Sequence, residues 1–119
     1  MPRRRANFQL PDRRPPGGGA WLQVETTGVT VHGSMPHFGL NAIYKAARAI
    51  GNFERFSFDV APHPLLVGPT LNVGTIKGGM NLNSVPDLAE FTIDIRTIPG
   101  QDNETILSRV KAYLVMRQP

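Results

Sequence analysis

The sequence predicts a small α+β domain, a two-layer sandwich of the ferredoxin-like type in which two helices cover one face of an antiparallel sheet. Three observations favour it: stretches with the two-residue alternation of strands, stretches with the 3.6-residue period of helices, and their order along the chain, β-α-β-β-α. The 119 residues suffice for one domain with its own core. A β-α-β-β-α-β sandwich needs one more strand after the second helix, and we expect this final strand to be missing.

The first half of the domain is predicted to form a strand followed by a helix. The stretch "AWLQVETTGVTVHG", residues 20–33, is rich in β-branched residues, and its apolar positions change parity near Gly28, which favours a bend. A helical period then begins and is expected to end by Phe56, before the proline-rich loop at 61–69. Its predicted buried face consists of Leu40, Ile43, Ala47 and Ile50, and its polar side includes Lys45 and Arg48.

Two strands and a closing helix are predicted in the second half. Residues 70–79, "TLNVGTIKGG", form the first of these strands. The stretch "LAEFTIDIRTIPG", residues 88–100, shows the clearest alternation, because Phe91, Ile93 and Ile95 share one face and polar residues share the other. Asp102 is expected to cap the closing helix. The buried face of that helix is predicted to consist of Ile106, Val110 and Leu114, with Tyr113 beside it.

The net charge of +4 lies in the first residues and not in the domain. Five arginines and one aspartate fall within residues 1–18, whereas from Gly19 onward eight Lys and Arg balance eight Asp and Glu. Residues 1–19 combine arginine, proline and glycine without an apolar period, so we expect a disordered basic tail there and a domain at 20–119. Because the domain lacks a basic face, nucleic acid is not an expected partner.

Other classes of protein are excluded by what the sequence lacks. It has no cysteine, which excludes disulfides and thiolate metal sites and favours a cytoplasmic location. No stretch approaches the ~20 apolar residues of a membrane span. The three histidines, His32, His37 and His63, do not show the spacing of metal ligands, so no metal site is predicted, and His37 and His63 are expected to be structural and surface residues. Ser34 lacks the elbow of a nucleophilic serine and is expected to bond the backbone of its turn.

Two further features could serve a ligand or only the fold. In "KGGMNLNSVPD", residues 77–87, Gly78 and Gly79 do not have the signature of a phosphate loop. They are expected to allow a bend at the strand end, or the close approach of another backbone or a ligand. Arg96 lies in a strand, where its guanidinium could hold a ligand carboxylate or pair with Asp94 or Glu90 across neighbouring strands.

The ordered motifs of the chain resemble those of a known family. "GVTVHGSMPHFGLNAI", followed further along by "TLNVGTIKGGMNLNSVPDLAEFTIDIR", is similar to the dimerisation or lid domain of the zinc amidohydrolases of metallopeptidase family twenty. This family includes aminoacylase, acetylornithine deacetylase, succinyl-diaminopimelate desuccinylase and the glutamate carboxypeptidases. The resemblance extends from Ala20 to about Leu114. It implies a lid that is inserted into a catalytic domain holding zinc and a glutamate base.

The resemblance also implies roles for individual residues. The lid would form a homodimer, and His32 would reach the active site of the partner subunit and donate to the oxyanion of the tetrahedral intermediate. Asn83 and Arg96 would hold a substrate carboxylate, and Gly78 and Gly79 would let the backbone come close. The implied substrates are N-acyl amino acids or peptides that carry a carboxylate. Deacetylation, desuccinylation, carbamoyl cleavage and dipeptide hydrolysis all stay open.

The metal ligands of the family, an H-x-D motif, an E-E pair and later Asp and His, lie before and after the lid and do not occur in this sequence. We therefore expect an isolated lid-domain fragment from a truncated or split gene, which hydrolyses nothing by itself and whose zinc belongs to an absent catalytic domain. The alternative from another class is a free-standing dimeric interaction module with a basic arm that contacts an acidic partner or RNA. Salt-dependent binding that is lost on removal of residues 1–18 would favour that alternative.

Overall fold

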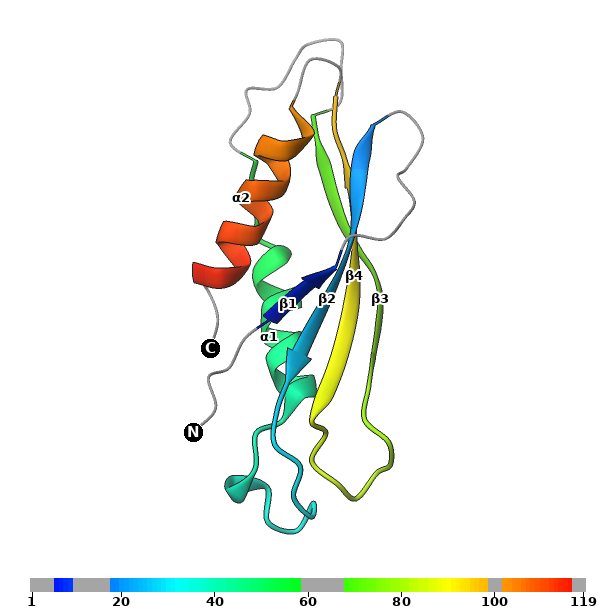
Figure 1. Cartoon of the computed structure of the whole chain (residues 1–119), viewed down its shortest axis with the longest axis vertical. Helices are drawn as coiled ribbons and strands as arrows, with labels where there is room; N and C mark the ends of the chain where they lie inside the picture. Colours follow the sequence, from blue (N-terminus) through cyan, green and yellow to red (C-terminus); the bar gives the residue numbers. More distant parts are fainter. Residues whose placement is uncertain (1–5, 10–17, 59–67, 99–101, 117–119) are drawn as a thin grey trace.

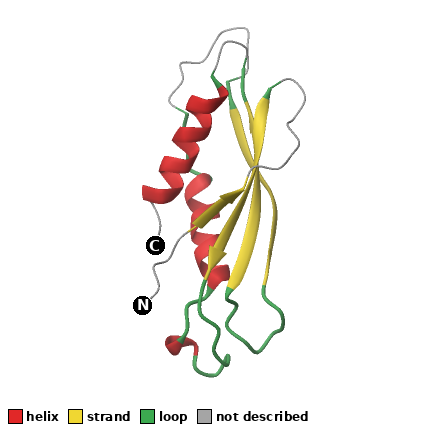
Figure 2. Ribbon diagram, in the orientation of Figure 1, coloured by secondary structure: helices red, strands yellow, loops and turns green. Residues whose placement is uncertain are grey.

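The structure, a computed structural model, describes residues 6–9, 18–58, 68–98 and 102–116 (Figure 1). Its elements in chain order are β1 (Ala6–Gln9), β2 (Gly19–Thr27), the 3₁₀ helix η1 (Pro36–Phe38), α1 (Ala42–Phe53), β3 (Thr70–Gly78), β4 (Leu88–Arg96) and α2 (Asn103–Met116). The strands form one antiparallel sheet in the order β1-β2-β4-β3, and both α-helices lie on one face of it (Figure 2). The predicted α+β class is confirmed.

The core lies between the sheet and the two helices. The alternation along β4 places Phe91, Ile93 and Ile95 inside, as predicted, and Leu22 and Val24 of β2 join them. From α2, the three predicted side chains are buried: Ile106, Val110 and Leu114. Burial of an apolar side chain of this size contributes about 1.5–3 kcal/mol. This shared layer therefore holds the helices against the sheet.

The buried face of α1 differs from the predicted one. Asn41 caps the helix, because its side-chain oxygen accepts a hydrogen bond from the Tyr44 backbone N–H at 3.1 Å. The prediction placed Ile43 and Ala47 inside, and both are exposed. The side chains that α1 buries are those of Ala42, Lys45, Ala46, Ala49 and Phe53. The 3.6-residue period was right and its phase was wrong, because the sheet accepts the small alanines at close range and leaves the larger Ile43 at the edge.

Lys45 is buried, although the sequence analysis placed it on the polar side of the helix. Its Nζ donates to the backbone oxygen of Thr27, the last residue of β2, at 2.6 Å. Close by, the buried Thr26 hydroxyl donates to the backbone oxygen of Ala42 at 2.7 Å. These two hydrogen bonds join the start of α1 to the end of β2. Hydrophobic periodicity does not predict these two hydrogen bonds, because both acceptors are backbone atoms.

Residues 6–9, which the sequence analysis assigned to a disordered tail, form the strand β1. They pair antiparallel with β2, with Ala6 opposite Thr26 and Gln9 opposite Gln23. Backbone pairing needs no apolar period, and the open edge of β2 offers a ladder to any extended segment that reaches it. β1 therefore runs parallel to β4, in the place and direction of a strand that would close a β-α-β-β-α-β sandwich. Residues 1–5 and 10–17 lie outside the described residues.

Candidate functional site at the tip of the sheet

Two loops meet at one end of the sheet and form a region that we call the tip. The first loop, residues 28–41, joins β2 to α1 and contains η1, and the second, residues 79–87, joins β3 to β4 (Figure 1). A bridge pairs His32 with Ser84, and the Gly33 N–H donates to the backbone oxygen of Asn83 at 2.8 Å. Backbone hydrogen bonds therefore hold the loop that carries His32 against the loop that carries Asn83.

Glycines allow close backbone approaches within the first loop and between the two loops. A Cβ atom added to Gly28 would lie 2.0 Å from the backbone oxygen of Leu40, and one added to Gly33 would lie 3.0 Å from that of Asn83. The Gly28 N–H also donates to the backbone oxygen of Asp87 at 2.8 Å. The change of parity predicts a bend near Gly28, but the contacts of this glycine are not predicted from the sequence. The position of Gly28 at the end of a strand indicates a bend, but it does not show which backbone atoms come close to this glycine.

His32 is exposed, and one of its ring nitrogens is occupied by Ser34. The Ser34 backbone N–H donates to His32 Nδ1 at 3.1 Å, and the Ser34 Oγ lies 2.7 Å from the same nitrogen. The expected bond of Ser34 to the turn backbone is replaced by this contact, and the turn itself is closed by the Met35 N–H, which donates to the His32 backbone oxygen at 2.9 Å. No hydrogen bond joins His32 Nε2 to another described residue.

Asn83 lies beside His32 on the second loop. Its backbone oxygen is used by the contact between the loops, whereas its side chain is exposed and makes no hydrogen bond within the described residues. His37, the other histidine of the tip, is also exposed, and its ring lies against Phe38 with the centroids 4.2 Å apart. The tip therefore brings together two of the predicted site residues, His32 and Asn83. The third histidine of the chain, His63, lies outside the described residues.

Gly78 and Gly79 lie where the second loop leaves β3. A Cβ atom on Gly78 would lie 2.8 Å from the Cβ of Ala89 and 3.0 Å from Cγ1 of Ile43, and Gly79 has a φ of +83°, in the left-handed region that favours glycine. The bend and the close approach expected for these glycines are both observed. Each has a reason within the fold that requires no substrate.

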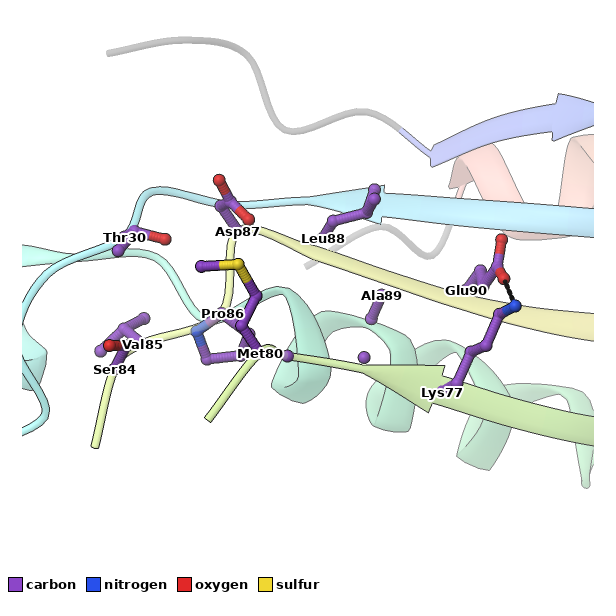
Figure 3. Close-up of a pocket in the computed structure, with 12 residues that line it drawn as sticks. Thr30, Lys77, Met80, Ser84, Val85, Pro86, Asp87, Leu88, Ala89 and Glu90 are labelled. Atoms are coloured by element: carbon purple, nitrogen blue, oxygen red, sulfur yellow. Dashed lines mark ion pairs between the residues drawn. The ribbon is translucent and has the colours of Figure 1, made fainter. Parts of the chain in front are cut away.

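A hollow of about 420 Å³ borders these two glycines (Figure 3). Met80 and Pro86 both line it, and Lys77 and Glu90 form an ion pair of 2.6 Å at its border. Its walls are mostly apolar, and the side chains of Val85, Leu88 and Ala89 contribute to them. None of His32, Asn83 and Arg96 lines it.

Arg96 lies at the other end of the sheet. β4 begins at Leu88 beside the tip and ends at Arg96, a span of about 27 Å for an extended strand. The guanidinium donates to Asp94 from Nε at 2.9 Å and from Nη2 at 3.2 Å, and the Trp21 indole N–H donates to the same carboxylate at 3.0 Å. Of the two alternatives for Arg96, the structure shows the pairing with an acidic neighbour, and that neighbour is Asp94 of the same strand instead of a residue across neighbouring strands. A single subunit does not bring Arg96 together with His32 and Asn83.

In the parts of the chain that the structure describes, no three His, Asp or Glu side chains converge on a point that could hold a metal ion. A zinc site requires three or four such ligands. The described residues therefore do not fit a zinc ion. Likewise, none of the helices within 18–58 and 102–116 has the length and apolar character needed to cross a membrane.

Relatives of known sequence match most of this chain. A family model described as the peptidase dimerisation domain matches residues 17–119. Acetylornithine deacetylase of Myxococcus xanthus is 32% identical over 105 residues, which cover 82% of this chain and 28% of that protein. N-acetyldiaminopimelate deacetylase of Leuconostoc citreum is 32% identical over 95 residues, which cover 79% of this chain and 24% of that protein.

A solved structure agrees with these matches. The aminobenzoyl-glutamate utilization protein from Klebsiella pneumoniae superposes with a TM-score of 0.64 and 25% identity, over 81% of this chain and 23% of that one. The chain thus spans about a quarter of the length of the relatives it matches. The resemblance carried by the sequence motifs is confirmed. The chain belongs to the peptidase dimerisation domain family of the metallopeptidase family twenty hydrolases.

Proposed function

We propose that this chain is the dimerisation and substrate-binding lid domain of a zinc-dependent amidohydrolase or peptidase of the deacetylase, desuccinylase or carboxypeptidase type. The observation that supports this most is the presentation of His32, an exposed imidazole on a hydrogen-bonded tip with no cluster of metal ligands among the described residues. In this proposal the exposed imidazole would serve a reaction whose other components belong to another domain. Zinc, held by the catalytic domain, would activate the water that attacks the amide.

The free edge of β3 is the surface that we assign to a homodimer. β3 is the last strand of the described sheet, and its Ile76 is 52% exposed. Ile43 and Tyr44 of α1 are exposed next to the end of β3, where they line a second hollow together with Met80 and Leu82. An unpaired strand edge beside exposed apolar side chains favours pairing with a second copy of the chain through a two-fold axis.

Antiparallel pairing of β3 with its copy would complete the site. β3 runs from Thr70, which is opposite Arg96, to Gly78, which adjoins the tip. In an antiparallel pair the Gly78 end of one strand lies beside the Thr70 end of the other. The tip of each subunit would then lie at the same end of the joined sheet as Arg96 of the partner subunit. This arrangement supports a site shared between two subunits, with His32 and Asn83 from one and Arg96 from the other.

Each residue would have one task in that shared site. The His32 imidazole would donate a hydrogen bond to the oxyanion that forms as the amide is attacked, and this stabilises the transition state electrostatically. The Asn83 amide and the Arg96 guanidinium, which Asp94 orients, would hold the carboxylate of an N-acyl amino acid or peptide. The backbone at Gly78 and Gly79 would lie close to the substrate because no side chain intervenes.

The test is a chimeric enzyme in which residues 17–119 replace the dimerisation domain of the acetylornithine deacetylase of Myxococcus xanthus. We expect His32→Ala to lower kcat on the order of 10²–10³-fold, the usual effect of removing an oxyanion donor. His37→Ala is the matched control, since His37 lies on the same loop and is equally exposed. Equal rates for the two variants would contradict the proposed role of His32.

A further inference from the structure

We infer that Ser34 is a positioning residue that sets the tautomer of His32. The Ser34 backbone N–H and hydroxyl both lie within hydrogen-bond distance of His32 Nδ1, at 3.1 Å and 2.7 Å. A backbone N–H only donates, so the Nδ1 that it contacts carries a lone pair. In a neutral imidazole the single ring proton is then on Nε2. Ser34 therefore directs the N–H group of the ring away from the turn.

The tautomer decides what His32 offers to another molecule. With the proton on Nε2, the ring presents a hydrogen-bond donor to whatever approaches the tip. With the proton on Nδ1, Nε2 presents a lone pair, which would repel a developing oxyanion. The inference rests on the proposed role of His32 as a donor, and it assigns to Ser34 the task of making that donor available.

The backbone of the tip fixes Ser34 in this position. The Met35 N–H donates to the His32 backbone oxygen at 2.9 Å, and this tight turn folds residue 34 back toward the ring. Gly33, between the two residues, is held to Asn83 by its own N–H at 2.8 Å. The contact of Ser34 with Nδ1 is thus set by hydrogen-bonded backbone on both sides. The hydroxyl oxygen is already 2.7 Å from Nδ1, so only a rotation about the Cβ–Oγ bond is needed for it to donate to the ring.

Long-range ¹H–¹⁵N NMR spectra of the ¹⁵N-labelled full chain would test this at a pH where the imidazole is neutral, because they distinguish the two tautomers. We expect His32 to carry its proton on Nε2. His37 is the internal reference, since its ring has no hydrogen bond to the described residues, and it should show both tautomers. Ser34→Ala removes the hydroxyl and keeps the backbone N–H, so it should raise the Nδ1-protonated fraction of His32 only part of the way toward that of His37. Ser34→Thr, which keeps the hydroxyl, should not.

A His32 ring protonated on Nδ1 in the unsubstituted chain would overturn the inference. A Ser34→Ala spectrum identical to that of the unsubstituted chain would overturn the part of the Ser34 hydroxyl in setting the tautomer. In the chimeric enzyme, Ser34→Ala should lower kcat at unchanged KM, and Ser34→Thr should retain the rate. If the tautomer is as inferred but His32→Ala does not slow hydrolysis, the proposed function is wrong and the inference about Ser34 stands. If His32→Ala abolishes hydrolysis but the His32 ring is protonated on Nδ1, the inference about Ser34 is wrong and the proposed function stands.

Discussion

Lys45 and Thr27 are joined by a hydrogen bond of 2.6 Å from a buried ammonium group to a backbone oxygen at the end of β2. This contact lies where the chain leaves the sheet and enters the first loop of the tip. Only 5% of Lys45 is exposed, so the hydrogen bonds of its ammonium group must be accepted by polar atoms of the protein. Lys45, which the sequence places on a polar helix face, therefore joins α1 to the end of β2.

We expect Lys45→Met, which keeps most of the volume and removes the amine, to lower the free energy of unfolding by about 1–3 kcal/mol because the Thr27 oxygen loses its buried partner. Urea denaturation of the purified chain measures this. Arg48→Met is the matched control on the exposed side of the same helix and should change the stability by less than about 0.5 kcal/mol. An equal loss of stability in both variants would show that the hydrogen bond from Lys45 to Thr27 does not stabilise the fold.

The glycines of the chain differ sharply in what a methyl group would meet. Gly28→Ala should destabilise the protein strongly, because the added Cβ would lie 2.0 Å from the Leu40 backbone oxygen. Gly51→Ala, inside α1 with no atom beyond its chain neighbours and its own helix backbone within 4 Å of the new Cβ, should stabilise it by about 0.5–1 kcal/mol. Thermal unfolding of the two variants gives the comparison. A Gly28→Ala protein as stable as the unsubstituted chain would refute the close contact.

Much of this fold follows from periodicity in the sequence. The alternation in β4 and the apolar spacing in α2 each identify a face correctly because large side chains repeat there and must be buried. The phase of α1 could not be read in this way. The face of α1 that contacts the sheet consists of small residues such as Ala46 and of Lys45, whose amine donates to a backbone oxygen of β2.

The candidate site was only partly accessible from the sequence. The sequence motifs identify His32 and Asn83, which are fifty-one positions apart in the sequence. Their proximity depends on backbone hydrogen bonds between the two loops that carry them. The separation of Arg96 from them follows only from the direction and length of β4. β1 was missed because its pairing depends on an open strand edge and not on its own composition.

The edge of β3 should control association of the chain. Ile76→Lys places a charge on this edge, and we expect it to shift sedimentation from dimer to monomer. Val115→Lys introduces the same charge on α2, at a side chain of similar exposure, and should leave the dimer intact. Dimers that persist with Ile76→Lys and dissociate with Val115→Lys would place the interface on the helix layer.

β1 should protect the opposite edge of the sheet. Removal of residues 1–16 exposes the ladder of β2 from Gln23 to Thr26, so we expect lower stability and association that increases with protein concentration. Removal of residues 1–5, which keeps β1, is the control. Light scattering and thermal unfolding report both effects. Identical behaviour of the two truncated chains would mean that β1 does not close the sheet in solution.

The most direct measurement of the shared site uses heterodimers of two damaged chimeric enzymes. One subunit carries His32→Ala and the other Arg96→Ala, and the pair is isolated through different affinity tags. If His32 and Arg96 of different subunits serve one substrate, one of the two sites keeps both residues, and the heterodimer should show about half of the unsubstituted activity. If both residues act within one subunit, every site is damaged, and a heterodimer no more active than either homodimeric variant would contradict the shared site.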